Sequence, residues 1–325
     1  MIQVLRGEMG ELYLLADIGG TNARFGLAEG KDLAIKQEKT FKVADFFTIA
    51  DALHAYLDWT GERPTAACFA VAAPVDGEEI HFTNSNWKFC PEELRRTLGL
   101  TRLLAVNDFF ALANGIRHLT PDFFIQIKEG PGEPSAPTLV MGPGTGFGQA
   151  LIVPCRGGSC IVSTESGHAA YAPQSDEEIV VLEFASRQNN RVIVEHLLSG
   201  PGLITIYGAL CELNGVKNTD LDASEITASA LAADNMIAVK ALNLFCAILG
   251  RVAGDAVLSA GAQAGVVLGG GILPRVKEFF IESDFIYYFL DKACRRDYVG
   301  VAPVRMIVKE GASLIGAAAV LKDVE

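Results

Sequence analysis

The stretch from Leu12 to Glu29 combines an apolar run, an acidic residue and a glycine turn. Leu12–Ala16 predicts a buried strand that ends at Asp17, and alternation resumes in Ala23–Ala28. The turn between them consists of Gly19, Gly20, Thr21 and Asn22, preceded by Ile18. A dinucleotide-binding glycine loop would open a helix instead. We therefore expect a β-hairpin whose backbone N–H groups hold an anion; the alternative is an ordinary hairpin with Asp and Gly as turn formers.

Two aspartates in the first third of the chain could take part in catalysis. Asp17 could hold Mg²⁺, through water, because this ion keeps much of its hydration shell. Asn107 and Asp108 follow the apolar strand Leu103–Val106, at a strand end where α/β proteins place functional groups. Asp108 is a candidate general base that accepts a hydroxyl proton. The alternative is that Asp108 caps a helix that begins at Phe109.

Two further glycine-rich turns follow apolar strands, at Gly142–Gly148 and Gly269–Gly271. Together with the first turn they suggest a bound nucleotide, with two hairpins on its phosphates and the third turn beside its base or ribose. The chain has no GxxxxGK[ST] motif and no HRD or DFG signature. Phosphate binding would therefore rest on backbone amides and a metal ion.

A polar loop predicted at Ser163–His168 carries Glu165 and His168, and Glu195 precedes an apolar pair. Carboxylate, amide and imidazole groups are the partners needed by the neighbouring hydroxyls of a sugar. Each of these residues, taken alone, is more often an ordinary surface or core residue than a ligand for a sugar.

Composition narrows the class of protein. The 325 residues carry 27 Lys and Arg against 39 Asp and Glu, for a net charge of −12. Without a basic cluster, nucleic-acid and anionic-membrane partners are not expected. The seven cysteines form no CxxC motif, and Cys155 and Cys160 lack companions for a zinc site. We expect reduced thiols in a cytoplasmic protein. The long apolar region Ala238–Leu273 contains charges and is expected to form core.

The order of predicted elements indicates an α/β protein of two domains. Strands and short helices alternate through the first third, and the strand–turn–strand pattern returns at Thr138–Pro154. Met236–Ser259 predicts a long central helix, and Ala312–Lys322 a final one. We expect a small domain formed by residues 1–118 plus 309–325 and a large domain formed by residues 119–308.

The motifs taken together resemble the bacterial ATP-dependent glucokinases of the actin-like/hexokinase ATPase superfamily. The landmarks are DIGGTNAR (17–24), AAPVDG (72–77), TNSNW (83–87), NDF (107–109), GPGTGFG (142–148), ESGH (165–168), LSGPGL (198–203) and GGGILPR (269–275). The resemblance implies two ribonuclease-H-like domains with an interdomain active-site cleft that closes over glucose and Mg-ATP. It also implies a cytoplasmic enzyme, expected to be a homodimer. The cysteine-rich zinc motif of the repressor–ORF–kinase group is lacking.

The resemblance also implies residue roles. Asp108 would be the base for the sugar 6-hydroxyl, and Asp17 would hold the metal. The remaining sugar hydroxyls would be bound by Asn107, Glu165, His168 and Glu195, with Asn84 in a loop over the sugar. The nucleotide would be bound by Asp17, Gly19, Gly20, Thr21, Asn22, Gly144, Thr145 and Gly270. Ser166 stands where the family loop commonly has Gly. Alternatives are a kinase for another hexose, such as mannose or fructose, and a non-catalytic sugar sensor on the same fold; a nicotinamide dehydrogenase is disfavoured by the strand after Gly20.

Overall fold

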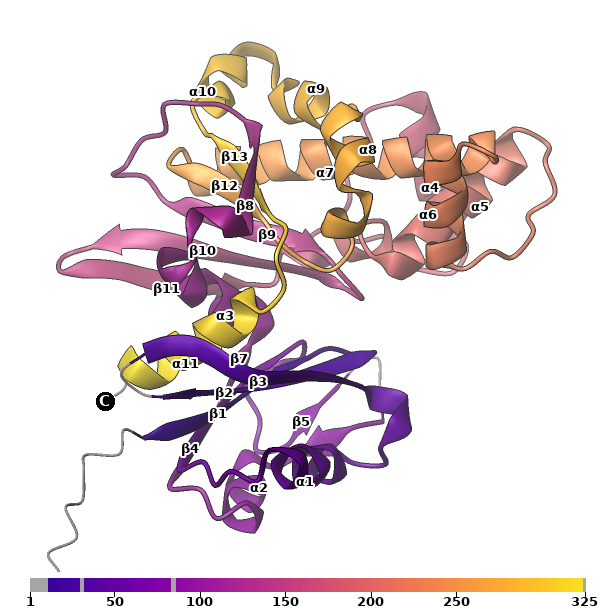
Figure 1. Cartoon of the computed structure of the whole chain (residues 1–325). Coiled ribbons are helices and arrows are strands. Elements are labelled where there is room, and N and C mark those ends of the chain that lie inside the picture. The colour runs from indigo at the N-terminus through magenta and orange to yellow at the C-terminus, as the bar shows by residue number, and fades with distance from the viewer. Residues whose placement is uncertain (1–10, 30–31, 83–85, 324–325) are drawn as a thin grey trace, which may run out of the picture. The chain divides into compact units, whose positions relative to one another are not determined.

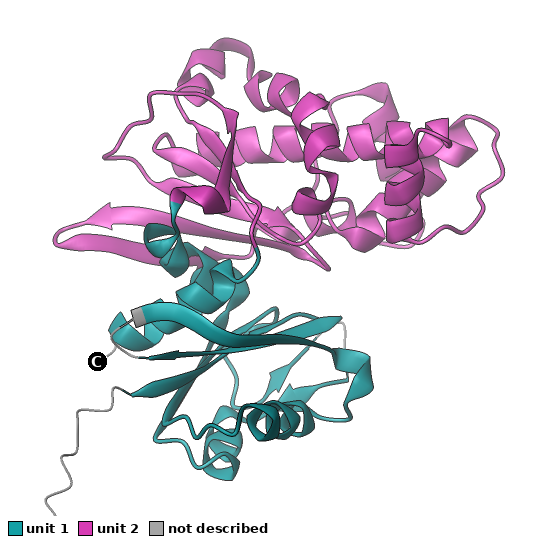
Figure 2. Ribbon diagram, viewed as in Figure 1, with its two compact units in different colours: residues 1–120, 310–325 teal, residues 121–309 magenta. Residues whose placement is uncertain are grey.

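The computed structural model describes residues 11–29, 32–82 and 86–323 of the chain. The chain divides into two compact units, shown in different colours in Figure 2. Unit 1 comprises Met1–Thr120 and Glu310–Glu325, and unit 2 comprises Pro121–Lys309.

Unit 1 is built on a five-stranded sheet with the order β3-β2-β1-β4-β7. Its strands are β1 (Leu12–Ile18), β2 (Asn22–Glu29), β3 (Asp32–Lys42), β4 (Ala66–Val71) and β7 (Arg102–Asn107). The first three form antiparallel pairs, whereas β1, β4 and β7 run parallel. A separate small sheet pairs β5 (Ile80–His81) with β6 (Lys88–Phe89).

Helices cover both faces of the unit 1 sheet (Figure 1). One face packs against α1 (Ile49–Thr60) and α2 (Pro91–Thr97), and the other against α3 (Asp108–Gly115) and α11 (Ala312–Asp323). Successive side chains of β1 point to opposite faces, so Leu14 joins the α1 core while Leu15 joins the α11 core. Burial on both faces explains why β4 is apolar throughout and why β1 is apolar except at Asp17.

Unit 2 contains a six-stranded sheet with the order β11-β10-β9-β12-β13-β8. Its strands are β8 (Phe124–Lys128), β9 (Thr138–Pro143), β10 (Phe147–Cys155), β11 (Gly158–Thr164), β12 (Gly265–Leu268) and β13 (Val304–Ile307). The helices lie on one side of this sheet in Figure 1. They are α4 (Asp176–Ser186), α5 (Gly200–Leu213), α6 (Ala223–Ala232), α7 (Met236–Ala260), α8 (Lys277–Glu282), α9 (Phe285–Leu290) and α10 (Arg296–Gly300).

The central element of unit 2 is α7. Its first N–H groups are capped by Asn235, and it ends at Gly261 in a left-handed conformation, as helix ends commonly do. By length and composition α7 could cross a membrane, but most of its apolar window is buried inside unit 2. The expectation of a core helix in this region is therefore confirmed.

Several expected elements are confirmed and others are wrong. The β1–β2 hairpin forms as expected, and Pro91 is the first residue of α2, where its missing N–H is harmless. Strand β3 was not expected, because its Lys- and Glu-rich sequence is that of an exposed edge strand rather than an apolar one. Residues 163–164 belong to β11 and not to a loop. Helix α1 begins at Ile49 because Thr48 caps it with a reciprocal bond to Asp51.

Candidate active site

The parallel strands of unit 1 bring Asp17 and Asp108 to the same edge of one sheet. Ile18 of β1 lies beside Val71 of β4, and Val71 lies beside Asn107 of β7. Strands are spaced about 4.8 Å apart, so the ends of β1 and β7 are separated by roughly 10 Å. Asp17 precedes Ile18, and Asp108 follows Asn107 as the first residue of α3. Two carboxylates therefore stand near the carboxyl ends of parallel strands, where ligands bind in α/β proteins.

The tip of the β1–β2 hairpin is held by its own backbone and by the chain that follows β3. The Gly19 N–H donates to the Asn22 carbonyl over 2.9 Å, and the Val43 N–H donates to the Thr21 carbonyl over 2.9 Å. A Cβ atom added at Gly19 would make only an ordinary contact of 3.8 Å, and its backbone is not left-handed. The fold therefore does not by itself require glycine at this position.

Asp17 is surrounded by groups from both ends of the chain. It lies opposite Arg24 in the β1–β2 register, and Ser313 in the first turn of α11 hydrogen-bonds its side chain. Arg24 is in turn held by Thr40 over 3.2 Å and by an ion pair with Glu310. Burial raises the pKa of the Asp17 carboxyl above its ordinary value, although Arg24 and Ser313 act to lower it.

Asn107 and Asp108 both lie at the start of α3, but they occupy different positions in it. Asn107, not Asp108, is the residue that caps α3: its Oδ1 accepts from the N–H groups of Phe109 and Phe110 at 3.0 and 3.1 Å. Asp108 Oδ1 also accepts from the Phe109 N–H, at 2.9 Å. The alternative expected from the sequence, that Asp108 is the cap of this helix, is therefore wrong. Its half-buried carboxylate occupies the first helical position.

In unit 2, the tip of the β9–β10 hairpin is fixed to the start of α5. The Gly144 N–H donates to the Gly146 carbonyl over 2.7 Å, and the Gly200 N–H donates to the Gly144 carbonyl over 3.0 Å. Thr145 is exposed between the two glycines. A Cβ atom on Gly144 would meet nothing closer than 4.0 Å, so a side chain has room here as it does at Gly19.

Phe147, the first residue of β10, connects this hairpin to the residues expected to bind a sugar. Its N–H donates to Glu195 Oε2 over 2.7 Å. Its carbonyl oxygen would lie 2.5 Å from a Cβ atom on Gly167, so only glycine allows the Glu165–His168 segment to pack this closely. Within that segment, His168 Nδ1 lies 3.5 Å from Glu165 Oε2, and both side chains are well exposed.

Short backbone ladders join the segments on either side of these residues. The Val194 N–H donates to the Ala169 carbonyl over 3.0 Å, and the Tyr171 N–H donates to the Val192 carbonyl over 3.1 Å. The segment after His168 and the segment before Glu195 are therefore held side by side. Unit 2 thus brings Gly144, Thr145, Glu165, His168 and Glu195 around one residue, Phe147.

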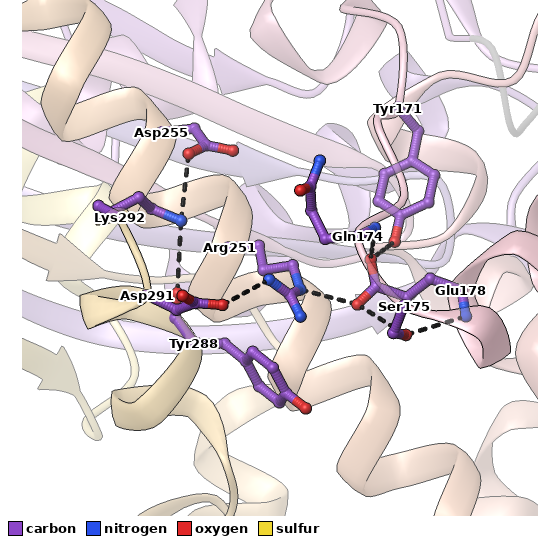
Figure 3. Close-up of polar contacts among 9 residues, drawn as sticks. All are labelled: Tyr171, Gln174, Ser175, Glu178, Arg251, Asp255, Tyr288, Asp291 and Lys292. Atoms are coloured by element: carbon purple, nitrogen blue, oxygen red, sulfur yellow. Dashed lines mark hydrogen bonds and ion pairs between the residues drawn. The ribbon is translucent and has the colours of Figure 1, made fainter. Parts of the chain in front are cut away.

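A buried ionic network holds Tyr171, which lies at the end of this backbone ladder (Figure 3). Glu178 of α4 is 1% exposed and accepts from Tyr171 Oη at 2.6 Å and from Arg251 Nε at 2.7 Å. Arg251 of α7 also pairs with Asp291 at 3.1 Å and lies over the Tyr288 ring. Burial and the Glu178 carboxylate raise the pKa of Tyr171, so its hydroxyl stays protonated and donates.

The third glycine turn packs directly onto the β9–β10 hairpin. The Gly269 N–H donates to the Met141 carbonyl over 2.8 Å. Gly270 has φ of +88°, and a Cβ atom there would lie 2.2 Å from the Pro143 carbonyl oxygen. A Cβ atom on Gly142 would lie 2.0 Å from the Gly269 carbonyl oxygen. The glycines at 142 and 270 are therefore required by backbone packing.

Asn84 lies outside the described residues. Sequence reasoning did not single out Phe147, Gly167, Arg24 or Ser313, all of which position expected site residues. A signal for the first two lay in the GPGTGFG and ESGH motifs, whereas nothing in the sequence pointed from Ser313 to Asp17. Among the described residues, no group of three or more His, Cys, Asp and Glu side chains could hold a metal ion.

Comparison with known proteins identifies the family. The family model described as Glucokinase matches residues 14–324. The glucokinase of Hahella chejuensis is 40% identical over 313 residues, which are 96% of this chain and 97% of that protein. The crystal structure of a glucokinase from an Antarctic psychrotroph is 36% identical with a TM-score of 0.82, and covers 96% of this chain and 99% of its own. A Balamuthia mandrillaris glucokinase solved in complex with glucose is 25% identical with a TM-score of 0.82, over 95% of this chain and 93% of its own.

The likeness extends over nearly the whole chain in both sequence and structure. The α/β architecture is that of the actin-like ATPases, as the resemblance implied. The chain therefore belongs to the glucokinase family, whose members phosphorylate glucose.

Proposed function

We propose that this chain transfers the γ-phosphoryl group of ATP to O6 of glucose, with Asp108 as the general base. The observation that carries the proposal is the placement of Asp17 and Asp108 at one edge of one sheet, in a chain of the glucokinase family. The glucose complex of the Balamuthia mandrillaris relative supports glucose as the sugar.

Asp108 is suited to accept the proton of the attacking hydroxyl. Its carboxylate stands at the amino-terminal end of α3, directly after a parallel strand of the sheet. Asn107 caps the helix, so the backbone that carries Asp108 is fixed before substrate binds. Removing the proton as O6 attacks phosphorus typically contributes about 10²–10⁴-fold in rate. Positioning of the two substrates would supply most of the remainder.

The two hairpin tips are proposed to hold the phosphate groups through backbone N–H groups. At Gly19 and at Gly144 the fold leaves room for a side chain that the sequence does not use. A ligand that must approach the backbone closely explains why glycine stands there. Gly20, Thr21, Asn22 and Thr145 would complete these two tips. Gly270, packed on the same hairpin of unit 2, would lie near the adenosine.

Asp17 fits a largely hydrated Mg²⁺ ion better than a fully protein-bound one. Burial disfavours its charge, and a cation beside it would relieve that penalty. Because the described residues offer no cluster of three ligands, the other positions would be filled by water and phosphate oxygens. When bound, Mg²⁺ supplies neutralisation of charge on the phosphate oxygens.

The sugar hydroxyls are proposed to bind Asn107, Glu165, His168 and Glu195, and the family resemblance adds Asn84 as a further sugar-binding residue. Glu195 is oriented by the Phe147 N–H, and Asn107 by the backbone of α3. Because Asn107 Oδ1 is used in the cap, its amide nitrogen is the group that would donate to a hydroxyl. A site built from oriented polar groups discriminates strongly against a sugar that leaves them unpaired.

The test is a coupled assay of the purified chain with Mg-ATP and a panel of hexoses. We expect turnover with glucose well above that with mannose or fructose. Higher turnover with one of the other hexoses would reassign the substrate. Glucose binding without turnover on any hexose would instead indicate a sugar sensor.

A further inference from the structure

Two cysteines meet at the far tip of the β10–β11 hairpin of unit 2. Cys155 is the last residue of β10, and Cys160 is the third residue of β11. Their Sγ atoms are 2.9 Å apart, and both residues are exposed. Neither residue has a place in the proposed phosphoryl transfer, so the pair needs a separate explanation.

The hairpin register explains why the two thiols meet. Cys155 lies opposite Gly158, and Cys160 lies two residues further along the same strand, so both side chains point to one face of the sheet. Such diagonal neighbours are usually too far apart for small side chains to touch. Gly158 carries no side chain, which allows Cys155 to lean across toward Cys160. The two-residue turn depends on Gly157, whose φ of +91° suits glycine.

The surroundings favour redox chemistry over metal binding at this pair. A structural zinc ion needs four ligands, and no third His, Cys, Asp or Glu joins the two thiols in the described part of the chain. A disulfide needs a sulfur–sulfur distance of about 2.05 Å, and the two Sγ atoms already lie 2.9 Å apart. Reagents in solution can reach both sulfurs because both residues are exposed.

None of the other five cysteines combines exposure with a neighbouring cysteine in the described part of the chain. Cys68, Cys211 and Cys246 are buried, and burial raises the pKa of Cys68 and of Cys246 to about 12, which keeps both as unreactive thiols. Cys294 is exposed but has no cysteine partner among the described residues, and Cys90 is partly buried.

We propose that Cys155 and Cys160 form a reversible dithiol–disulfide site that reacts with low-molecular-weight disulfides such as oxidised glutathione. The thiolate of one cysteine attacks a glutathione sulfur, forms a mixed disulfide and releases one glutathione thiolate. The second cysteine thiolate then attacks the protein sulfur of that mixed disulfide and displaces the second glutathione. The protein loses two electrons and two protons, and both pass to the two glutathione molecules. The inference does not depend on the proposed sugar kinase activity.

The test is a thiol count and an intact mass on the full chain after exposure to excess oxidised glutathione and acid quenching. We expect the count to fall from seven thiols to five, a mass lower by two hydrogen atoms, and a cross-linked peptide containing both residues. A thiol reductant should restore all seven. Attachment of a glutathione to each cysteine, or no fast loss of thiols, would overturn the proposal.

Matched variants assign the reaction to the pair. Cys155→Ser and Cys160→Ser should each stop at a stable mixed disulfide with one glutathione, because the resolving thiol is missing. Cys294→Ser, which removes an exposed cysteine elsewhere, should still lose two thiols as the parent chain does. Internal disulfide formation that persists in Cys155→Ser would contradict the assignment. These substitutions change exposed side chains, so we expect each variant to fold. The thermal transition of each variant checks this.

Discussion

At the scale of single residues, the burial of Asp17 lowers the stability of the ligand-free chain, and the same residue is proposed to bind the metal ion. Burial raises the pKa of its carboxyl, so the ionised form is disfavoured in the folded chain without ligands. We expect Asp17→Asn to raise the free energy of unfolding at pH 7, in the absence of Mg²⁺ and nucleotide. The same variant should lose roughly 10–100-fold in activity. This is the loss typical of residues that act on a metal ion through another ligand, such as a bound water, rather than by direct coordination. Chemical denaturation and the coupled assay measure the two effects.

The pH dependence of this effect follows from the direction of the pKa shift. Between the ordinary Asp pKa, about 3.9, and the raised folded value, the folded chain binds more protons than the unfolded chain. Asp17 therefore makes stability fall as pH rises through that window. The stability gained by Asp17→Asn should grow with pH across it and then level off. A gain that shrinks as pH rises would contradict a raised pKa.

The glycines of the proposed nucleotide site fall into two kinds, which substitution can separate. Gly19→Ala places a Cβ atom in ordinary contact, so we expect the free energy of unfolding to be unchanged or up to about 1 kcal/mol higher. The added methyl group should nevertheless weaken ATP binding, because it stands where the phosphates approach the backbone.

Gly142→Ala is the matched comparison for Gly19→Ala. Its Cβ atom would lie 2.0 Å from the Gly269 carbonyl oxygen, so this variant should be clearly destabilised. Thermal unfolding and the KM for ATP of both variants provide the test. Equal destabilisation of the two variants, or an unchanged KM for ATP in a folded Gly19→Ala, would remove the argument for a ligand at the hairpin tip.

At the scale of elements, the Glu178–Arg251 pair connects α4 and α7, and Glu178 also accepts a hydrogen bond from Tyr171 (Figure 3). Burial acts to lower the pKa of Arg251, but the Glu178 and Asp291 carboxylates more than offset it. Removing the Glu178 charge leaves a buried guanidinium with only Asp291. We expect Glu178→Gln to lower the free energy of unfolding by several kcal/mol, near the 3–5 kcal/mol typical of a broken buried pair.

The control is an ion pair on the surface of the same unit. Arg187 and Glu212 form two bonds of 2.7 Å, but both side chains are more than half exposed. Glu212→Gln should therefore cost at most about 1 kcal/mol. Because Tyr171 connects Glu178 to the 165–171 segment, we also expect a higher KM for glucose in Glu178→Gln only. Similar losses of stability in the two variants would argue against an anchoring role for the buried pair.

The elements that sequence could predict are those that local patterns determine. The β1–β2 hairpin follows from its alternation and turn residues, and α2 from Pro91 and its acidic first turn. Strand β3 was not predicted. It is an edge strand rich in charged residues, so its sequence lacks the alternation of apolar and polar residues that marks a strand. The helix is capped by Asn107 and begins at Asp108; Asn and Asp are both common caps, so the sequence does not distinguish between them.

At the scale of the whole molecule, unit 1 is completed by the last segment of the chain. Helix α11 packs Leu314 and Leu321 against the sheet and brings Ser313 to Asp17, 296 positions earlier in the sequence. The resemblance supplied the roles of Asp17 and Asp108, and the parallel register places both at one edge of the sheet. Contacts such as Ser313 with Asp17, or Phe147 with Glu195, arise only when distant segments pack, so sequence spacing could not predict them.

The most direct test of the account compares Asp108→Ala with Asp176→Ala. Both residues are the first of a helix whose cap is the preceding side chain, and Asp176 is an exposed residue of unit 2 with no role in the proposed site. We measure glucose phosphorylation, and the rise in melting temperature caused by glucose, which stabilises only the folded form that binds it. Asp108→Ala should lose about 10²–10⁴-fold in kcat and keep the glucose-induced rise, whereas Asp176→Ala should keep both. Turnover by Asp108→Ala close to that of the parent chain would contradict the assignment of Asp108 as the base.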